Sequence, residues 1–167
     1  VFLPVVSVYQ TILPDFAQQG VRNFFNNIRE ITTLINSILQ LSFKKTYQTS
    51  GRFVFNTTFG VLGLFDVATV AEIPRHQEDF GQTLGYWGVG NGPYLVLPIL
   101  GPSNLRDGVG LAVDTLTMRE IRNWALDLET WQEWTWLVMD AVDTRANIAF
   151  RYYETGSPFE YEWVRLL

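Results

Sequence analysis

The feature that most restricts the fold of this chain is an uncharged stretch from Phe80 to Leu105. Its 26 residues exceed the roughly 20 that a helix needs to cross a bilayer, but they include six glycines and three prolines and cannot form one plain helix. Non-helical backbone at membrane depth is tolerated only where protein buries it or a water-filled cavity wets it. We therefore expect the segment to line an internal passage. The alternative is a surface loop with tight turns, which is the commoner use of glycine.

Apolar residues recur at helical spacing in the first quarter of the chain. The pattern i, i+3, i+4, i+7, i+8, which places side chains on one helical face, is formed by Ile31, Leu34, Ile35, Ile38 and Leu39. The opposite face consists of Thr32, Thr33, Asn36, Ser37 and Gln40. This second face is polar but uncharged, whereas helices that face bulk water commonly carry Lys and Glu. It would suit the wall of a shallow channel.

Further helices are predicted along the chain, and no segment shows convincing strand-type alternation. The predicted helices are Lys44 to about Thr57, Leu62 to Ala71 with Pro74 as the stop, a helix capped by Ser103, two helices between Glu120 and Phe150, and a short helix after Pro158. There is no internal repeat and no low-complexity linker. We therefore expect an all-α fold in a single domain over residues 1–167.

Two other uncharged segments, 31–43 and 53–65, are each thirteen residues long. At about 1.5 Å per helical residue, such a segment reaches through roughly one leaflet of a bilayer. The chain is also 47% apolar and only 17% charged, against roughly 25% charged residues in ordinary soluble domains. Some of this apolar surface is expected to face lipid or a partner. The sequence thus predicts a monotopic membrane protein.

Charge and cysteine content exclude several kinds of partner. A net charge of −5 with scattered basic residues disfavours nucleic acid, whose phosphates require clustered Lys and Arg. Lys44 and Lys45 are the only adjacent basic pair, so membrane affinity is expected to be apolar rather than electrostatic. The sequence contains no cysteine and therefore no disulfide and no lipid-bearing cysteine. Because Val1 begins directly in an apolar stretch, we expect a processed or trimmed amino end.

His76, Glu78 and Asp79 form the one compact cluster of potential metal ligands or acid–base groups. Zinc sites require three or four His, Cys or carboxylate ligands, and this chain has one His and no Cys, so a structural cluster is expected. No Gly-x-Ser-x-Gly motif is present, and the glycine run from Gly88 to Gly92 lacks the Lys-Ser/Thr of a phosphate-binding loop. We predict no metal, no cofactor and no enzymatic activity, with a lipase that uses Ser103 and His76 as an alternative.

Several blocks of the sequence together resemble the MlaA (VacJ) family of outer-membrane lipoproteins. The blocks are Gly20 to Ile28 (GVRNFFNNI), Arg52 to Thr58 (RFVFNTT), Gly63 to Ala68 (GLFDVA) and His76 to Gly110, within which Glu78 to Gly85, Trp87 to Gly90, Gly92 to Tyr94, Leu97-Pro98, Gly101-Pro102 and Leu105 to Asp107 are the most specific. Val142 to Ala146 (VDTRA) extends the resemblance to nearly the whole chain.

The resemblance implies a ring of amphipathic helices in the periplasmic leaflet of a Gram-negative outer membrane, around a central amphipathic channel and with the Gly/Pro-rich segment as a loop. It also implies that phospholipid misplaced in the outer leaflet enters this channel headgroup first and passes to a soluble periplasmic carrier protein. The implied partners are phospholipid, a trimeric outer-membrane porin and that carrier. A polar bore would avoid the cost of moving charge through hydrocarbon.

The resemblance also predicts which residues lie at the lipid channel. They are Asn23, Phe24 and Phe25 near the membrane boundary, and Phe80, Gly81, Gly85, Tyr86, Trp87, Gly88, Gly90 and Tyr94 in the glycine-rich block, with Tyr86 and Trp87 as gate or wall. The family's lipid-modified cysteine and its early Asp-Pro and Asn-Arg motifs are not in this chain, so anchoring is inferred from the resemblance alone. The alternative from another class is a structural protein that braces porins without passing lipid.

Overall fold

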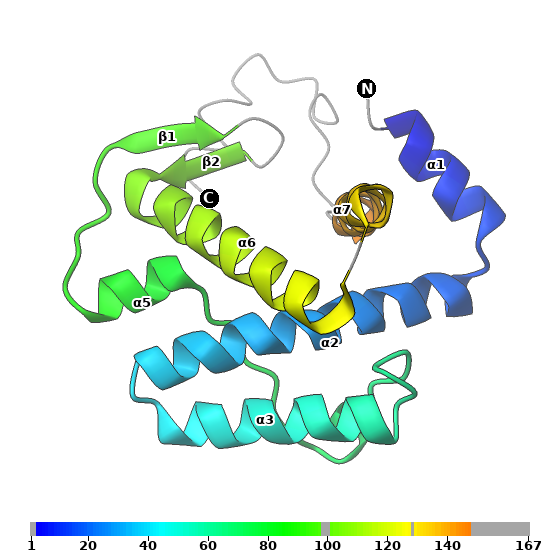
Figure 1. Cartoon of the computed structure of the whole chain (residues 1–167), viewed down its shortest axis with the longest axis horizontal. Coiled ribbons are helices and arrows are strands. Elements are labelled where there is room, and N and C mark those ends of the chain that lie inside the picture. Colours follow the sequence, from blue (N-terminus) through cyan, green and yellow to red (C-terminus); the bar gives the residue numbers. More distant parts are fainter. Residues whose placement is uncertain (1–2, 98–100, 128, 148–167) are drawn as a thin grey trace, which may run out of the picture.

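The computed structural model describes residues 3–97, 101–127 and 129–147 of the 167-residue chain. Helices dominate the fold, with one short pair of strands (Figure 1). In chain order the elements are α1 (Leu3–Ile12), α2 (Asp15–Leu39), α3 (Phe43–Thr58), α4 (Val67–Val70), α5 (Phe80–Tyr86), β1 (Tyr94–Leu97), β2 (Gly101–Asn104), α6 (Leu105–Leu126) and α7 (Thr130–Asn147). The predicted all-α class is confirmed.

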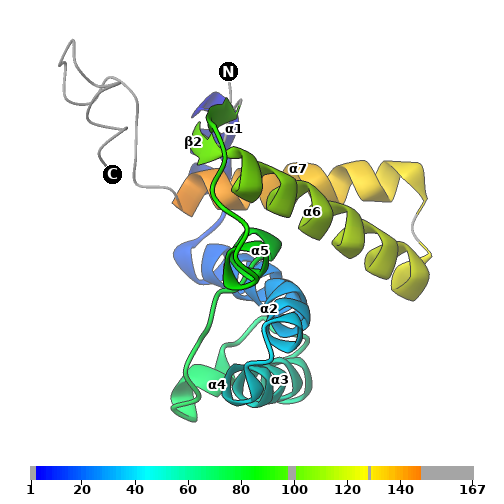
Figure 2. The same ribbon diagram turned by 90° about the vertical axis from the view of Figure 1, so that its left-hand side faces the viewer.

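Helices α2 and α3 lie side by side in both ribbon views (Figures 1 and 2). The predicted helix 44–57 matches α3 to within one residue at each end. The polar face of α2 is buried and its apolar face is exposed, which is the reverse of a helix in a soluble protein. Asn36 and Ser37 are fully buried, whereas Ile38 and Leu39 are exposed. The polar face predicted as a channel wall therefore packs largely against other elements of the protein.

The chain between α3 and α4 corrects one predicted helix. The sequence predicts a helix from Leu62 to Ala71, but only the four residues of α4 are helical, and residues 59–65 form turns and a bend. Val61 and Leu62 have φ values of +52° and +58°, a left-handed conformation that ends helix propagation. Asp66 then caps α4 through its side chain.

Two strands lie in a segment for which the sequence predicts none. β1 pairs antiparallel with β2, and Tyr94 stands opposite Asn104. The sequence shows no convincing strand-type alternation and therefore does not predict this hairpin. The signal was weak because each strand has only four residues, and β2 contains Pro102, which is tolerated only at the edge of a sheet.

Helix α6 begins one residue later than predicted. Ser103 belongs to β2, and Asn104 caps the helix instead, since its Oδ1 accepts a hydrogen bond from the Asp107 amide at 2.9 Å. Asp127 ends α6 in a left-handed conformation with φ +46°, and α7 diverges from α6 beyond this point (Figure 2). The two helices predicted between 120 and 150 correspond to the end of α6 and to α7, as far as residue 147. The predicted final helix lies outside the described residues.

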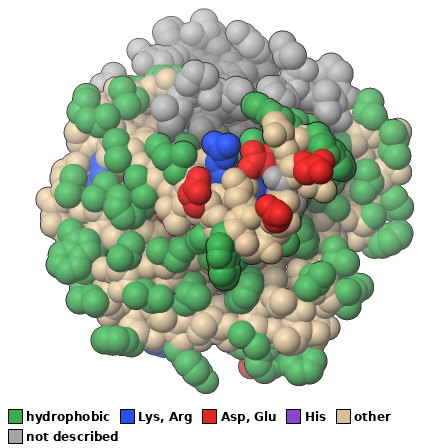
Figure 3. Space-filling model, viewed as in Figure 1, with side chains coloured by type: hydrophobic (Ala, Val, Ile, Leu, Met, Phe, Trp, Pro, Cys, Tyr) green, Lys and Arg blue, Asp and Glu red, His purple; other side chains and the backbone are tan. Residues whose placement is uncertain are grey.

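Burial in this fold is the reverse of that in a water-soluble domain. Among the described residues, Phe25, Ala68 and Val142 are the buried hydrophobic side chains, whereas twelve polar or charged residues are buried. Many large hydrophobic side chains are exposed, and Figure 3 shows hydrophobic side chains scattered over the described part of one face, with charged side chains near its middle. Surfaces of this kind mark contact with membranes or partners. No helix within the described ranges is both long and apolar enough to cross a membrane.

Candidate functional site

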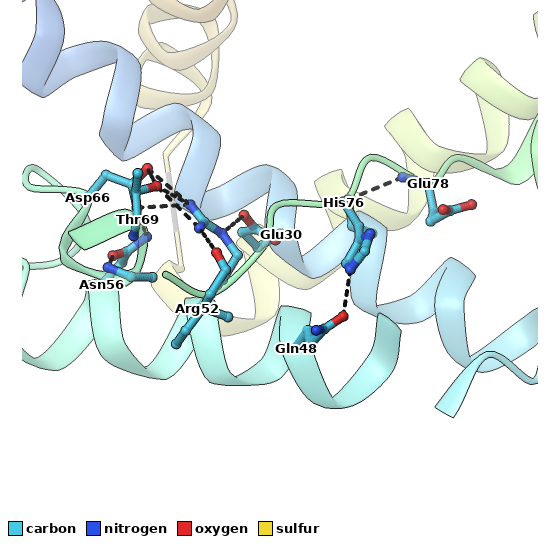
Figure 4. Close-up of polar contacts among 11 residues, drawn as sticks. Glu30, Gln48, Arg52, Asn56, Asp66, Thr69, His76 and Glu78 are labelled. Carbon is cyan, nitrogen blue, oxygen red and sulfur yellow. Dashed lines mark hydrogen bonds and ion pairs between the residues drawn. The ribbon is translucent and has the colours of Figure 1, made fainter. Parts of the chain in front are cut away.

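A buried arginine joins α2, α3 and the segment around α4 (Figure 4). Arg52 on α3 is 2% exposed. Its Nε donates to Glu30 at 3.0 Å, its Nη2 donates to both carboxylate oxygens of Asp66 at 2.8 and 3.0 Å, and its Nη1 donates to the Ile73 carbonyl at 2.6 Å. Asn56 adds a hydrogen bond to Asp66 at 3.1 Å. Every nitrogen of the guanidinium is thus used, as a buried charge requires.

This network shifts the pKa values of its two carboxylates in opposite directions. Burial raises the pKa of Glu30 above its ordinary value, even though the hydrogen bond and charge of Arg52 act against the increase. Burial also acts to raise the pKa of Asp66, but hydrogen bonds from Thr69 and Asn56, together with the charge of Arg52, outweigh it and leave the pKa lowered. The network therefore keeps Asp66 charged at the N-terminal end of α4.

A second polar network joins α2 to α5 and α6. Gln40 donates to Thr83 at 3.2 Å, Thr83 donates to Asn36 at 2.8 Å, and Asn36 donates to Asp114 at 3.0 Å. The Asp114 carboxylate also accepts from the Phe80 amide at 2.8 Å. Burial raises the pKa of Asp114. These contacts fix α6 against α2 and determine the shape of the space beside them.

A groove of about 600 Å³ lies between α2, α6 and α7. Its volume falls within the range of roughly 300 to 1,000 Å³ that is usual for small-molecule sites. The lining combines charged residues such as Arg29 and Asp114 with apolar ones such as Leu111, Trp134 and Leu137. A molecule with a polar and an apolar part would find both kinds of surface here.

Two ion pairs cross the groove between helices. Arg29 on α2 contacts Asp140 on α7 at 2.5 Å, and Arg119 on α6 contacts Glu133 on α7 at 3.5 Å. Arg122, one turn beyond Arg119, has no ion pair or hydrogen bond to any residue that the structure describes, and its Nε is buried without a partner. The groove therefore contains an arginine, Arg122, that has no salt bridge to a described residue.

A second cavity, of about 310 Å³, is almost entirely apolar and shares Phe25 and Trp136 with the groove. Phe24, Phe25 and Trp136 form an edge-to-face cluster with ring centroids 5.5 to 5.6 Å apart. Val21 and Met139 add aliphatic surface. The two cavities are therefore neighbours separated by an aromatic wall.

Glycines allow α5 to lie directly on α6. A Cβ atom added to Gly110 would lie 2.3 Å from the backbone nitrogen of Gly81, and one added to Gly81 would lie 2.8 Å from the Asp107 carboxylate. A Cβ atom on Gly85 would lie 2.9 Å from Arg106 Nη1. The first part of the glycine-rich segment is therefore a close helix crossing, which neither the passage nor the surface-loop interpretation foresees.

The second part of the segment is an exposed turn. Tyr86 and Trp87 are 58% and 61% exposed, and their rings meet edge to face at 5.6 Å. Trp87 Nε1 donates to the Leu39 carbonyl at 3.2 Å, which ties the turn to the end of α2. Gly88 and Gly92 have φ values of +87° and +70°, so glycine is required at both positions. This part matches the alternative interpretation of an exposed loop with tight turns.

The residues of the predicted structural cluster make separate structural contacts. His76 Nε2 is 2.8 Å from Gln48 Oε1, and Lys45 donates to Glu78 at 2.6 Å. Asp79 caps α5 by accepting from the Gln82 amide. Within the described ranges, no group of three potential ligands is placed to hold a metal ion. His76, Glu78 and Asp79 thus make hydrogen bonds and an ion pair of the kind that the structural interpretation expects.

The predicted channel residues divide into two sets. Phe24 and Phe25 line the apolar cavity, Phe25 also lines the groove, and Phe80 lines a smaller cavity of about 90 Å³ beside Asp114. The remaining predicted residues lie outside these three cavities and are Asn23, Gly81, Gly85, Tyr86, Trp87, Gly88, Gly90 and Tyr94. Their role at a lipid channel stays a prediction.

Sequence reasoning missed the charged residues of the groove. A signal was present, because Asp114, Met118, Arg119 and Arg122 recur at the spacing of one helical face. Their pairing depends on how α6 and α7 cross, and no local pattern reveals that crossing.

The MlaA lipoprotein family model matches the chain over residues 1–167. The chain belongs to the MlaA family. The intermembrane phospholipid transport system lipoprotein MlaA of Shigella flexneri is 34% identical over 150 residues, which are 87% of this chain and 57% of that protein, and its Escherichia coli K12 counterpart is 33% identical over the same shares. An uncharacterized protein of Rickettsia prowazekii is 42% identical over 107 residues, which are 64% of this chain and 43% of that protein.

A solved structure from work on the "Structural basis for maintenance of bacterial outer membrane lipid asymmetry" has the same fold. It superposes with a TM-score of 0.70 at 29% identity and covers 99% of this chain and 87% of that chain. The MlaA resemblance of the sequence blocks is thereby confirmed. The chain spans about half the length of the curated relatives that it matches, from 43% of the Rickettsia prowazekii protein to 57% of the Shigella flexneri MlaA.

Proposed function

We propose that this chain is the phospholipid-translocating component of the system that maintains outer-membrane lipid asymmetry. It removes phospholipid mislocalised in the outer leaflet and passes it to a soluble periplasmic carrier. The MlaA proteins of Shigella flexneri and Escherichia coli, which are named for intermembrane phospholipid transport, support this assignment. In this proposal the helices form a ring in the periplasmic leaflet beside a porin trimer, anchored through a lipid-bearing cysteine outside these 167 residues.

The observation that carries the proposal is a charged groove inside a protein whose exterior is apolar. Exposed hydrophobic side chains suit the acyl chains of a surrounding leaflet. The groove between α2, α6 and α7 presents arginine and carboxylate side chains together with tryptophan and leucine. A headgroup can stay solvated there while its acyl chains remain in apolar surroundings, so no charge has to enter hydrocarbon unprotected.

We assign a gate to the glycine-rich turn at the end of α2. Tyr86 and Trp87 project from the turn next to the end of α2, where the Trp87 indole is hydrogen-bonded to the Leu39 carbonyl. Gly88 and Gly90 leave the backbone beyond them free of bulky side chains. We assign these residues to the entrance of the passage, with Tyr94 in the hairpin that follows.

Transport in this proposal makes and breaks no bond. Ser103 Oγ donates to the neighbouring Asn104 carbonyl, and His76 pairs with Gln48, so the two side chains do not form a nucleophile–base pair. The competing non-enzymatic function is a structural protein that supports a porin without passing lipid. A lined groove with both charged and apolar surface favours transport, because a brace needs no such internal space.

Two cysteine variants test lipid passage, because these 167 residues contain no cysteine and each variant adds one thiol to them. Thr115→Cys places a thiol in the groove, and Val54→Cys places one on the exposed apolar face of α3. Each full-length variant is labelled with a bulky maleimide before reconstitution into vesicles. A fluorescent phospholipid is placed in the leaflet opposite to the protein, and dithionite is added on the protein's side. Dithionite bleaches only the lipid that has crossed to that side, so the rate of bleaching measures lipid passage.

Blocking the groove should abolish this bleaching, whereas the label at position 54 should leave it within about twofold of the unlabelled protein. Transport that continues at full rate with the groove label in place would contradict a path through this groove. No bleaching by the unlabelled protein would favour the structural function.

A further inference from the structure

Arg122 is placed as an anion-binding residue. It lines the groove from α6, whereas the neighbouring groove arginines, Arg29 and Arg119, contact Asp140 and Glu133 on α7. Its Nε is buried and has no hydrogen-bond partner. Buried polar groups are nearly always satisfied, and an exception requires an explanation such as a missing ligand.

The surroundings of Arg122 hold its guanidinium toward the groove. Its Cζ atom lies 5.5 Å from the centroid of the Trp136 ring, a cation–π geometry. This contact uses none of the guanidinium N–H groups as a hydrogen-bond donor, so they remain available to an acceptor. A phosphate group matches the planar guanidinium through two parallel hydrogen bonds, as a carboxylate does.

The wall behind Arg122 leads to a place for an apolar chain. Trp136 and Phe25 line both the groove and the apolar cavity of about 310 Å³, so one molecule can contact the cation and the cavity at the same time. Phe24 and Leu64 also line this cavity. A single anion would use only the first of these features, and a hydrocarbon would use only the second.

We propose that Arg122 binds the phosphate of a phospholipid, and that one acyl chain of the same molecule occupies the apolar cavity behind Trp136. This inference rests on the proposed transport function and adds to it a defined resting site along the path. The site selects lipids by their phosphate and not by the rest of the headgroup. Diacylglycerol, which has the chains without the phosphate, should therefore bind less tightly.

Native mass spectrometry of the full-length protein in detergent can count the lipids bound to each chain. Phosphatidylglycerol and diacylglycerol with identical acyl chains are titrated separately. We expect wild type to prefer phosphatidylglycerol by about tenfold, the size of one charge-assisted hydrogen bond. Arg122→Gln should remove this preference and leave diacylglycerol binding unchanged, whereas Arg122→Lys should retain most of it. The control Arg22→Gln changes an exposed arginine of α2 outside both cavities and should behave as wild type.

The apolar half of the site has its own variant. Thr135→Trp fills the cavity from α7 and should weaken both lipids equally, by about tenfold or more. Equal affinity of wild type for the two lipids, or an unchanged preference in Arg122→Gln, would contradict the phosphate site at Arg122. Neither result would contradict the proposed transport function. If wild type binds neither lipid, the proposed function fails as well. Because the wild-type preference is measured without any substitution, a variant that fails to fold does not prevent the test.

Discussion

At the scale of single residues, Arg52 shows how this protein differs from a soluble one. Its guanidinium is enclosed by Glu30, Asp66 and a backbone carbonyl, in a place where a soluble helical domain would contain leucine or isoleucine. Polar contacts of this kind stabilise the interior when the exterior faces hydrocarbon, because apolar side chains then gain little from moving inward. The sequence places Arg52 in a family block but does not reveal that it is buried.

Replacing Arg52 should strongly destabilise the fold. Arg52→Met leaves the buried Glu30 and the partly exposed Asp66 without their cation, and breaking a buried ion pair such as Arg52–Glu30 typically costs about 3 to 5 kcal/mol. Arg52→Lys should also be destabilising, because a single ammonium cannot reproduce the fork. Thermal unfolding in detergent measures the change, with the exposed Arg22→Met as control. Similar melting temperatures for Arg52→Met and Arg22→Met would contradict a structural role for the network.

Acid should weaken the same network through Asp66. Its pKa is lowered in the folded state, so its contribution to stability is present above the ordinary pKa of aspartate, about 3.9, and is lost as the pH falls through the lower folded value. Glu30 has the opposite effect. Its pKa is raised in the folded state, so its protonation at lower pH removes the cost of a buried charge and stabilises the fold. Melting temperatures between about pH 5 and pH 2 should therefore fall less in Asp66→Asn, and more in Glu30→Gln, than in wild type. Parallel curves for all three proteins would be inconsistent with these shifts.

At the scale of elements, local patterns predicted those helices whose boundaries are set locally. α3 and the apolar pattern of α2 follow from periodicity alone. The segment before α4 does not, because a β-branched residue such as Val61 rarely adopts a positive φ and gives no warning that the chain will turn there. The hairpin was missed because β2 consists of Gly, Pro, Ser and Asn, which have low strand propensity.

The crossing of α5 and α6 depends on glycine and can be tested with a matched pair. Gly110→Ala places a Cβ atom 2.3 Å from the Gly81 backbone nitrogen and should cost about 1 to 3 kcal/mol as the helices separate. Gly51→Ala on α3 meets no atom within 4 Å and should stabilise its helix by about 0.5 to 1 kcal/mol. Chemical unfolding of the two variants should thus shift in opposite directions. If both variants were less stable than wild type, the effect of Gly110→Ala could not be assigned to the crossing of α5 and α6.

At the scale of the whole molecule, the sequence indicated the lipid surroundings of the protein more clearly than it indicated the position of the groove. Its low charge and apolar excess predict contact with lipid, and the sequence blocks correctly identify the family. The groove was beyond reach, because Arg122 and Trp136 are on different helices and meet only through tertiary packing. Composition can reveal that an apolar surface exists, whereas the position of a polar interior depends on how helices cross.

In the proposed function, the groove between α2, α6 and α7 is a water-filled path within an apolar exterior. The most direct measurement is the rate at which a charged, membrane-impermeant maleimide labels Thr115→Cys and Val54→Cys when the full-length protein is in bilayers. We expect the groove thiol at position 115 to react at least about tenfold faster than the thiol at position 54, because thiolate forms readily in water and poorly in hydrocarbon. Equal rates, or faster labelling at position 54, would contradict it.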